Sequence, residues 1–341
     1  MKILIIILVA FMGFAFTGEN LMKLVYPSYF PEPLYSFKAN ELTQEKINLG
    51  RMLFYDPILS KDQTISCANC HSAYNAFAHT DHDLSHGIHD SIGMRNAPAL
   101  FNLAWQNTFM WDGAIHNLDM QALAPLNHPA EMDEDIENVV HKLNELHRYK
   151  KAFYAAWGDS MVTGEHFLKA ISQFQLTLVS ATAKYDAMKS GTTNFTEQEK
   201  AGYSIFQKNC NSCHREPLFS SYGYANNGLA MDTALNDLGR YRVTKKDEDK
   251  LKFKIPSLRN LSYTYPYMHD GRFDKLHEVL NYYTNLKPGD SPEIALRSAL
   301  KLTSKDKTDI IAFLRTLDDK QFVFDLKNKY PKKLLLQIKN K

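Results

Sequence analysis

The sequence predicts an all-α protein of two related helical domains, and three observations support this fold class. Apolar residues recur at helical spacing, for example at Phe167, Ile171 and Phe174, whereas no convincing alternation of apolar and polar residues marks a strand. Capping patterns that start helices begin at Thr196 and Thr303. Several short motifs occur once in each half of the chain, which indicates an internal duplication. A length of 341 residues is enough for two domains, each with its own core.

The first residues of the chain predict export. Lys2 is followed by an apolar run over residues 3–16 and by small residues, so residues 1–18 are interpreted as a secretory signal peptide. The run has about 14 residues, fewer than the roughly 20 that a membrane span needs, and the alternative is an uncleaved N-terminal membrane anchor. Both interpretations lead us to expect a periplasmic protein. The net charge of +2 argues against a nucleic-acid binder.

Helical and irregular stretches alternate along the first half. Residues 19–40 are rich in aromatic residues and proline and predict an irregular arm, and residues 41–54 predict a helix. Residues 71–95 are expected to form a polar, mobile surface loop with few apolar anchors. Loops and short helices packed over a cofactor are expected across residues 97–130. A long helix follows and is expected to end near Gly191.

Turn-forming residues divide the chain into its two halves. Residues 189–194 are polar and contain a glycine, so they are predicted to link an N-terminal domain, 19–188, to a C-terminal domain, 189–341. In the second half, the charged residues 245–254 predict a solvated hairpin or loop. The basic tail, residues 327–341, is expected to be a solvated end.

A five-residue motif occurs twice, as Cys67-Ala-Asn-Cys70-His71 and as Cys210-Asn-Ser-Cys213-His214. Cys-x-x-Cys-His is the attachment signature of c-type haem. Two thiols one helical turn apart can add to the two vinyl groups of one porphyrin, and the adjacent histidine then lies under the iron as its ligand. The motif therefore predicts two cytochrome c-like domains, each with one covalent c-type haem.

Cys-x-x-Cys has three other interpretations: a zinc half-site, a redox dithiol and a disulfide. A zinc site should pair its halves at short separation, but these two lie far apart in the chain. A redox motif does not require a histidine after both pairs. The four cysteines of the motifs are also the only ones in the chain, so no thiol remains for another use.

The two halves share more than the haem motif. Gly-x-x-x-Phe precedes both motifs, and Trp111-Asp-Gly and His269-Asp-Gly are each followed by a leucine seven residues after the Trp or His. The residues fourteen positions after Trp111 and His269 are Pro125 and Tyr283. A phenol can bind iron and a proline cannot. If this position faces the iron, the second site is closed and the first has room for a small molecule.

Further stretches carry a resemblance to one family: Gly93-Met-Arg-Asn-Ala-Pro98, Phe109-Met-Trp-Asp-Gly113, Gln121-x-x-x-Pro125, Glu131-Met132, Ile255-Pro-Ser-Leu-Arg-Asn260 and Tyr265-Pro-Tyr-Met-His-Asp-Gly271. The chain resembles the di-haem cytochrome c peroxidase and MauG family over roughly residues 40–318. The resemblance implies an N-terminal domain with the peroxidatic haem and a C-terminal domain with the electron-transfer haem.

The resemblance also implies the iron ligands. His71 and His214 correspond to the proximal ligands. The family's common form has a methionine as distal ligand of the second haem at the position of Tyr283, and the MauG branch has a tyrosine there. Tyr283 is therefore the expected ligand. The alternatives are a core tyrosine at 283 with another ligand in its place: Tyr282, Met268 or His269.

Glu131 is the carboxylate that the family pattern places over the open haem. Peroxide cleavage needs a group that takes a proton from one oxygen and returns it to the other, and burial can raise the pKa of a carboxylate for this task. Gln121 is expected to share the pocket and to orient peroxide or water. The alternative is that Glu131 is a surface acid in the same acidic stretch as Glu134, Asp135 and Glu137.

Three further assignments follow from the resemblance. From the sequence alone Trp111 would be read as a core aromatic residue, but the resemblance implies that it corresponds to a tryptophan between the haems that passes electrons. Asn96, Thr264 and Pro266 correspond to an inter-domain calcium site with oxygen ligands. The histidines from His79 to His89 are expected to be solvated, with one of them a candidate ligand of the first haem in a resting state.

The resulting prediction is a periplasmic peroxidase that reduces hydrogen peroxide at the first haem. Electrons would reach it through the second haem from a small c-type cytochrome or a cupredoxin. One alternative is a MauG-like oxidase that uses high-valent di-haem iron to oxidise a protein or an organic substrate. The other is a di-haem electron carrier without chemistry of its own. A homodimer is also expected.

Overall fold

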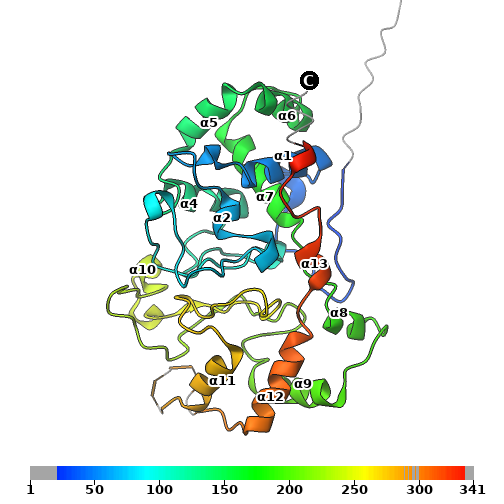
Figure 1. Cartoon of the computed structure of the whole chain (residues 1–341), viewed down its shortest axis with the longest axis vertical. Coiled ribbons are helices and arrows are strands. Elements are labelled where there is room, and N and C mark those ends of the chain that lie inside the picture. The colour runs from blue at the N-terminus through cyan, green and yellow to red at the C-terminus, as the bar shows by residue number, and fades with distance from the viewer. Residues whose placement is uncertain (1–20, 288, 291, 294–295, 297–298, 335–341) are drawn as a thin grey trace, which may run out of the picture.

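The computed structural model describes residues 21–287, 289–290, 292–293, 296 and 299–334. The predicted signal peptide and the end of the basic tail lie outside the described residues. Two lobes are stacked along the long axis of the molecule, with α1 and α7 in one lobe and α9, α11 and α12 in the other (Figure 1). In the described part of the chain, no helix is both long enough and apolar enough to cross a membrane.

The chain is predominantly helical. The helices of the first lobe are α1 (Gln44–Phe54), α2 (Cys67–Cys70), α3 (Leu118–Gln121), α4 (Leu123–Asn127), α5 (Ile136–Asn144), α6 (His147–Trp157) and α7 (Gly164–Leu176). They are followed by α8 (Lys184–Lys189), α9 (Glu197–Asn209), α10 (Tyr241–Thr244), α11 (Leu276–Thr284), α12 (Ser304–Arg315) and α13 (Lys320–Phe324). The antiparallel strands β1 (Tyr224–Ala225) and β2 (Phe253–Lys254) have two residues each. The helical fold class is confirmed.

Side chains fix the starts of the two helices whose capping patterns were predicted. At α9, the Glu199 backbone N–H donates to Thr196 Oγ1 at 3.3 Å, and the Thr196 N–H donates to Glu199 Oε2 at 2.7 Å. Thr303 and Asp306 form the same reciprocal pair at α12. Both predicted capping boxes are therefore confirmed. Each one satisfies backbone N–H groups that have no partner within the first turn of the helix.

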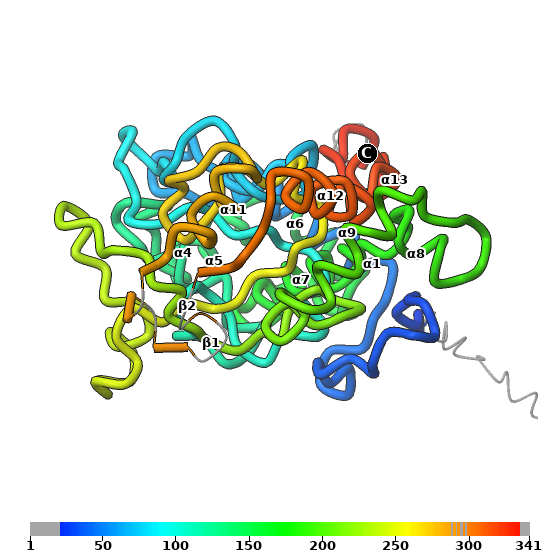
Figure 2. The backbone as a smooth tube through the Cα atoms, turned by 90° about the horizontal axis from the view of Figure 1, so that it is seen from below, coloured from blue at the N-terminus to red at the C-terminus, as the bar shows by residue number. Residues whose placement is uncertain are grey.

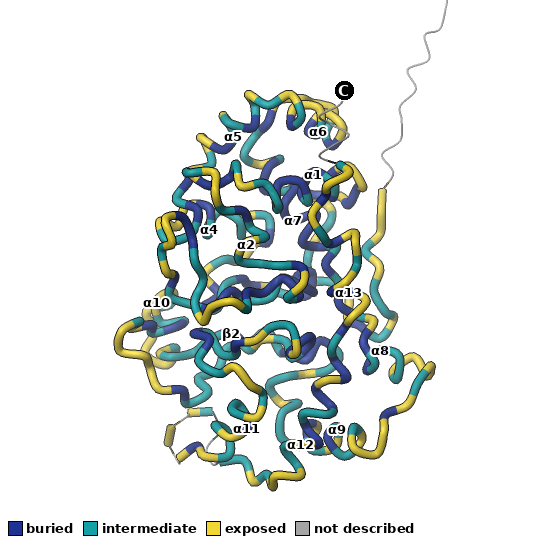
Figure 3. The backbone as a smooth tube through the Cα atoms, in the orientation of Figure 1, coloured by how far each residue is buried: buried dark blue, intermediate teal, exposed yellow. Residues whose placement is uncertain are grey.

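A glycine at a helix crossing organises the core of each lobe. A Cβ at Gly50 of α1 would collide with the carbonyl oxygen of Ala170 on α7 and would lie 3.1 Å from Phe174 Cβ. In the second lobe, a Cβ at Gly202 of α9 would collide with the carbonyl oxygen of Asp309 on α12. The Gly-x-x-x-Phe spacing that the two halves share therefore has a physical cause. Buried residues run along both crossings and the border between the lobes (Figure 3).

The long helix of the first lobe ends earlier than predicted. We expected it to end near Gly191, but α7 ends at Leu176 and α8 is a separate short helix. The chain between them is held by side chains from both lobes: the Ser180 N–H donates to Asn102 Oδ1 at 2.9 Å, and the Thr182 N–H donates to Asp319 Oδ2 at 2.8 Å. These tertiary hydrogen bonds replace the helical ones.

Two segments predicted to be solvated are partly buried. Within residues 71–95, the exposed fractions of Phe77, His79 and Ile88 are 0%, 9% and 2%, so the prediction of few apolar anchors is wrong. In the segment 245–254, Lys254 is buried on β2 and donates to the carbonyl oxygen of Thr108. Seen from below, residues 226–250, which include the short helix α10, lie at the edge of the molecule away from α8 (Figure 2).

After α12 the chain returns to the first lobe. Phe322 on α13 lies in the same apolar cluster as Phe77 and Phe101. Arg51 Nε of α1 donates to the carbonyl oxygen of Lys329 in the basic tail at 2.7 Å. The described part of the basic tail therefore docks on α1, and the red segment of Figure 1 shows this path. The limits of the two domains at 188 and 189 stay predictions.

Replacing the crossing glycines should destabilise the protein. Gly50→Ala and Gly202→Ala force the helix pairs apart, and overpacking of this kind costs about 1–3 kcal/mol or more. Thermal unfolding of the holoprotein checks this. Gly223→Ala is the control, because a Cβ there meets its nearest neighbour, Ser221 Oγ, at an ordinary 3.4 Å. An unchanged midpoint for Gly50→Ala and Gly202→Ala would contradict the packing argument.

Candidate functional site

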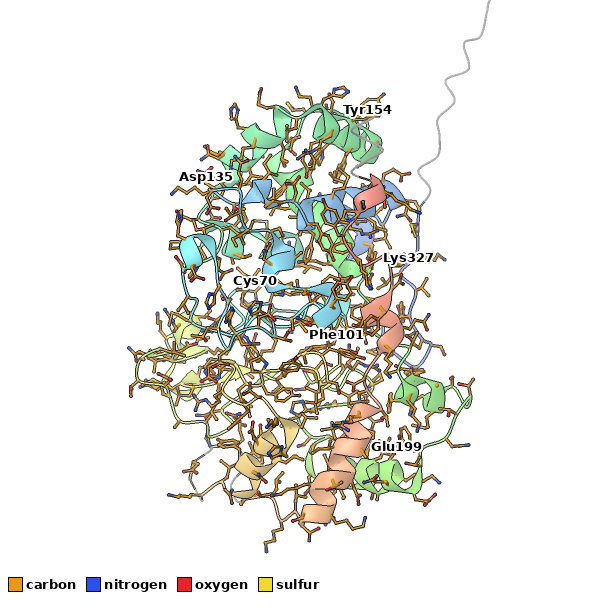
Figure 4. The ribbon with its side chains drawn as sticks, in the orientation of Figure 1. Cys70, Phe101, Asp135, Tyr154, Glu199 and Lys327 are labelled. Carbon is orange, nitrogen blue, oxygen red and sulfur yellow. The ribbon has the colours of Figure 1, made fainter. Side chains whose placement is uncertain are left out.

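The helical turn α2 positions the first Cys-x-x-Cys-His motif. Asn69 Oδ1 accepts hydrogen bonds from the backbone N–H of Ser66 at 2.9 Å and from its hydroxyl at 2.7 Å. The backbone N–H of His71 donates to the Cys67 carbonyl oxygen at 2.9 Å. These bonds hold Cys67, Cys70 and His71 on one turn. Figure 4 shows Cys70 in the upper lobe, near its border with the lower one.

Both motif histidines are oriented by backbone carbonyl groups. His71 Nδ1 lies 2.9 Å from the Phe77 carbonyl oxygen, and His214 Nδ1 lies 3.1 Å from the Pro256 carbonyl oxygen. A carbonyl oxygen only accepts, so Nδ1 carries the proton and Nε2 presents its lone pair. Desolvation lowers the pKa of each histidine to about 4, which keeps the rings neutral. This is the form of histidine that binds iron.

The motif cysteines do not have the properties of the three alternative sites. Burial raises the pKa of Cys67 to about 12 and that of Cys70 to about 11, whereas a redox dithiol needs a lowered pKa. The four cysteines form no disulfide. Within the described ranges, no three His, Cys, Asp or Glu side chains converge in a way that could hold a metal ion, as a zinc site requires.

A cavity opens beside the first motif. Its walls come from residues around α1, α2, α3, α4 and α7: Phe54, Leu59, Ile65, Ser66, Cys67, Cys70, His71, Leu100, Gln121, Ala122, Pro125, Leu126, Glu131, Met132, Phe167, Ile171 and Gln175. Apolar walls with a few polar groups are typical of a cofactor site. With two thiols on one turn and a histidine of fixed tautomer, these residues fit a covalently attached haem.

The cavity brings together the residues predicted for the first site. Gln121, Pro125 and Glu131 line it together with the motif. Burial raises the pKa of Glu131, and His128, whose Nδ1 lies 4.0 Å from Glu131 Oε1, opposes this rise.

The other acids of the same stretch are engaged elsewhere. Glu134 pairs with Lys142, and Asp135 accepts the Asn138 N–H at the start of α5. Glu137 is exposed. The position of Glu131 therefore fits its expected role, which stays a prediction.

Gln175 is a cavity residue that the sequence analysis missed. It is 3% exposed, and its Nε2 donates to Gln121 Oε1 at 3.4 Å. Its Oε1 is buried and has no hydrogen-bond partner among the described residues. A buried oxygen of this kind calls for a donor, which a bound molecule can supply. The only signal in the sequence is an amide between Phe174 and Leu176 on the apolar part of a helix.

The second site has a phenol where the first has a proline. The thiols of Cys210 and Cys213 lie close enough to Tyr283 to raise its pKa, although burial is the larger cause. Asn227 Nδ2 lies 3.4 Å from the Tyr283 hydroxyl and 3.5 Å from Met268 Sδ. Tyr283 and Met268 therefore face the same amide near the second motif.

The two other candidate ligands have different partners. The Tyr282 hydroxyl donates to the Asn227 carbonyl oxygen at 3.0 Å. The His269 ring is stacked on Phe253, with ring centroids 3.6 Å apart. This arrangement favours Tyr283 over both, and Tyr283 as the ligand stays a prediction.

Trp111 lies at the junction of the lobes. Its Nε1 donates to the Asn96 carbonyl oxygen at 2.9 Å, and its own carbonyl oxygen accepts the Lys254 N–H at 2.7 Å. Asn96 also donates its N–H to the His269 carbonyl oxygen at 2.8 Å. Trp111 is thus tied to the first half through its indole and to the second half through its backbone, and its role in electron transfer stays a prediction.

The predicted calcium site lies in the same region. Asn96 is buried, and its Nδ2 donates to the Asp83 carbonyl oxygen at 3.0 Å. Pro266 is buried and Thr264 is half-buried. A calcium ion at Asn96, Thr264 and Pro266 stays a prediction.

Comparison with known proteins decides the family. A family model described as di-haem cytochrome c peroxidase matches residues 44–194, and one described as cytochrome c matches residues 199–318. Methylamine utilization protein MauG of Methylorubrum extorquens is 34% identical over 305 residues, which cover 85% of this chain and 82% of that protein. Cytochrome c551 peroxidase of Nitrosomonas europaea is 32% identical over 308 residues, which cover 86% of each chain. The chain belongs to the di-haem cytochrome c peroxidase and MauG family.

Solved structures agree with this membership. A MauG-like protein associated with microbial copper homeostasis has a TM-score of 0.82 at 28% identity, covering 91% of this chain and 99% of that chain. The diheme peroxidase BthA of Burkholderia thailandensis has a TM-score of 0.72 at 22% identity, covers 92% of this chain and 96% of its own, and shows the fold alone. The family fold has two c-type haem domains, and its peroxidases imply hydrogen peroxide as substrate.

The histidine segment of this family member does not line the first cavity. The rings of His82 and His86 are stacked at 4.2 Å, and those of His79 and His82 lie 5.6 Å apart. The His86 carbonyl oxygen accepts a hydrogen bond from Cys70 Sγ at 3.4 Å. The segment therefore packs beside the motif, and His79 is buried rather than solvated as expected.

The stoichiometry of haem attachment tests the two sites directly. The purified protein should carry two covalent haems, and Cys70→Ser and Cys213→Ser should each weaken one attachment and leave the other intact. A pyridine haemochrome assay against protein concentration measures this. One haem per chain in the unaltered protein would contradict the assignment of both motifs.

Proposed function

We propose that this chain is a periplasmic di-haem peroxidase that reduces hydrogen peroxide at the site of the first lobe. The observation that carries the proposal is the difference between the two sites. The first has a cavity lined by Pro125, which has no group that can bind iron, and by the carboxylate of Glu131. At the matching position of the second site stands Tyr283. One open and one closed site suit an enzyme in which one haem reacts and the other relays electrons.

A bound haem supplies the iron centre at which peroxide takes up electrons. The protein supplies the groups that transfer protons and the apolar side chains that line the cavity. Glu131 accepts a proton from one peroxide oxygen and returns it to the other, and the amide of Gln121 orients the substrate. Gln175 holds Gln121 in place through its 3.4 Å contact. Phe54 and the other apolar walls exclude bulk water, which strengthens these polar interactions.

Electrons enter at the second lobe in this proposal. A small c-type cytochrome or a cupredoxin is the expected donor, and Trp111 is the expected step between the lobes. Support comes from the hydrogen bonds that tie Trp111 to Asn96 in one lobe and to Lys254 in the other. A pure electron carrier is disfavoured, because it has no use for a carboxylate of raised pKa in an open cavity.

Glu131→Gln should slow the reaction with peroxide by about 10²–10⁴-fold, the usual loss for a general acid–base group. Stopped-flow mixing with hydrogen peroxide measures the rate. In the unaltered protein the rate should fall as the pH drops through the pKa of Glu131, which lies above the ordinary value of 4.5, because the protonated carboxyl cannot accept a proton.

The Gln variant should lack this acid limb. Glu137→Gln is the control, because Glu137 is an exposed acid outside the cavity wall. Unchanged kinetics in Glu131→Gln would move the role to water or to Gln121.

A MauG-like oxidase is the second candidate function. The observation that favours it is the position of the Tyr283 phenol near the thiols of Cys210 and Cys213. An anionic phenolate stabilises oxidised iron more than a neutral thioether does, so such a site can hold oxidising equivalents for a protein or organic substrate. Reaction of the fully ferric protein with peroxide, without prior reduction, would favour this candidate over the peroxidase.

Tyr283→Met should raise the reduction potential of the second haem, because the variant replaces an anionic ligand with a neutral one. A spectroelectrochemical titration measures both potentials. Tyr282→Phe is the control and should leave them unchanged, since the Tyr282 hydroxyl contacts a backbone carbonyl oxygen. An unaltered potential in Tyr283→Met would point to Met268 as the ligand instead.

A further inference from the structure

A carboxylate in the second lobe accepts hydrogen bonds from two phenols. The Tyr203 hydroxyl lies 2.9 Å from Glu216 Oε2 and 3.1 Å from Oε1, and the Tyr185 hydroxyl donates to Oε2. The side chain of Gln207 donates to the same carboxylate. Neither haem motif includes these residues, and the proposed function does not use them.

The two phenols lead from the second haem motif towards the surface. Tyr185 is fully buried, and its ring packs edge-on against Phe219, with centroids 4.7 Å apart. Cys210 of the second haem motif packs against the apolar cluster that contains both Phe219 and Tyr185. Tyr203 is half-buried on α9, the helix that carries the label Glu199 in Figure 4. The order from the second motif outwards is therefore Phe219, Tyr185 and Tyr203.

The duplication shows that this arrangement is special to the second half. Tyr203 follows the crossing glycine of α9, and Arg51 occupies the same place after Gly50. Glu216 lies two residues after His214, whereas Ala73 lies two residues after His71. The common fold therefore does not require the phenols or the carboxylate at these positions.

We propose that Tyr185, Glu216 and Tyr203 form a proton-coupled relay through which single electrons pass from the surface of α9 to the second haem site. The inference rests on the proposed function, which supplies the oxidant, hydrogen peroxide. A phenol that loses an electron becomes a strong acid and needs a hydrogen-bonded acceptor for its proton. Glu216 is that acceptor for both phenols.

Tyr185 gives one electron to the oxidised haem site and its phenolic proton to Glu216, which leaves a neutral tyrosyl radical. Tyr203 then gives one electron to the Tyr185 radical and its own phenolic proton to Glu216, and Glu216 returns the first proton to Tyr185. A one-electron donor at the surface restores Tyr203, with the proton returned from Glu216. Hydrogen peroxide takes up two electrons and two protons to form two waters, so the relay acts twice per peroxide.

The test traps radicals in the holoprotein. The protein is mixed with hydrogen peroxide and a nitroso spin trap without an electron donor, and labelled residues are located by mass spectrometry beside EPR of frozen samples. We expect a tyrosyl signal and labelling of Tyr203. Tyr185→Phe and Glu216→Gln should each reduce Tyr203 labelling about tenfold. Tyr149→Phe is the matched control, because its phenol also donates to a carboxylate, Asp56 Oδ2 at 2.7 Å, in the first lobe.

A second arm separates this inference from the peroxidase proposal. Hexachloroiridate(IV), a one-electron oxidant, replaces peroxide, and the same labelling pattern is expected. If the spin trap labels Tyr203 after oxidation by hexachloroiridate(IV) but the protein does not consume peroxide, the peroxidase proposal is overturned and the relay remains supported. Wild-type labelling of Tyr203 in both the Tyr185→Phe and the Glu216→Gln variants, or no tyrosyl radical in either arm, would overturn the relay.

Discussion

The close crossing of two helices in each lobe is the constraint on which the rest of the structure depends. Because Gly50 has no side chain, the backbone of α1 lies directly against α7, and Phe54 at the end of α1 is brought against Phe174, with ring centroids 5.2 Å apart. Gly202 gives α9 and α12 the same arrangement, with Phe206 and Phe313 at 5.1 Å. Each crossing holds the helix that precedes a haem motif against its partner helix.

One scaffold with two sets of side chains explains how a duplicated chain can divide its work. The two motif histidines are held alike, each by a backbone carbonyl oxygen. The two sites differ in side chains that the shared fold does not determine: Pro125 stands in the first site and Tyr283 at the matching position of the second. A carbonyl oxygen is present whatever residue supplies it. The shared chemistry therefore rests on the backbone and the distinct chemistry on side chains.

The sequence allowed prediction of those features that depend on short spacings. The haem motifs, the capping box at Thr196 and the grouping of Gln121 with Glu131 are of this kind, because neighbours along the chain or a family pattern define them. The end of α7 was mispredicted and the role of Gln175 was missed. Both depend on contacts with distant segments: Asn102 and Asp319 draw the chain out of the helix, and Gln175 is defined by the cavity that it enters.

The return of α13 to the first lobe has a consequence for how the protein is made. Phe322 and Val323 complete an apolar cluster that otherwise consists mainly of residues from the first half of the chain. During synthesis, the first lobe therefore lacks part of its core until almost the whole chain has emerged. Incomplete cores expose apolar surface and are prone to aggregate. A shortened chain that stops after α12 would retain both haem motifs, but the apolar cluster of the first lobe would lack Phe322 and Val323.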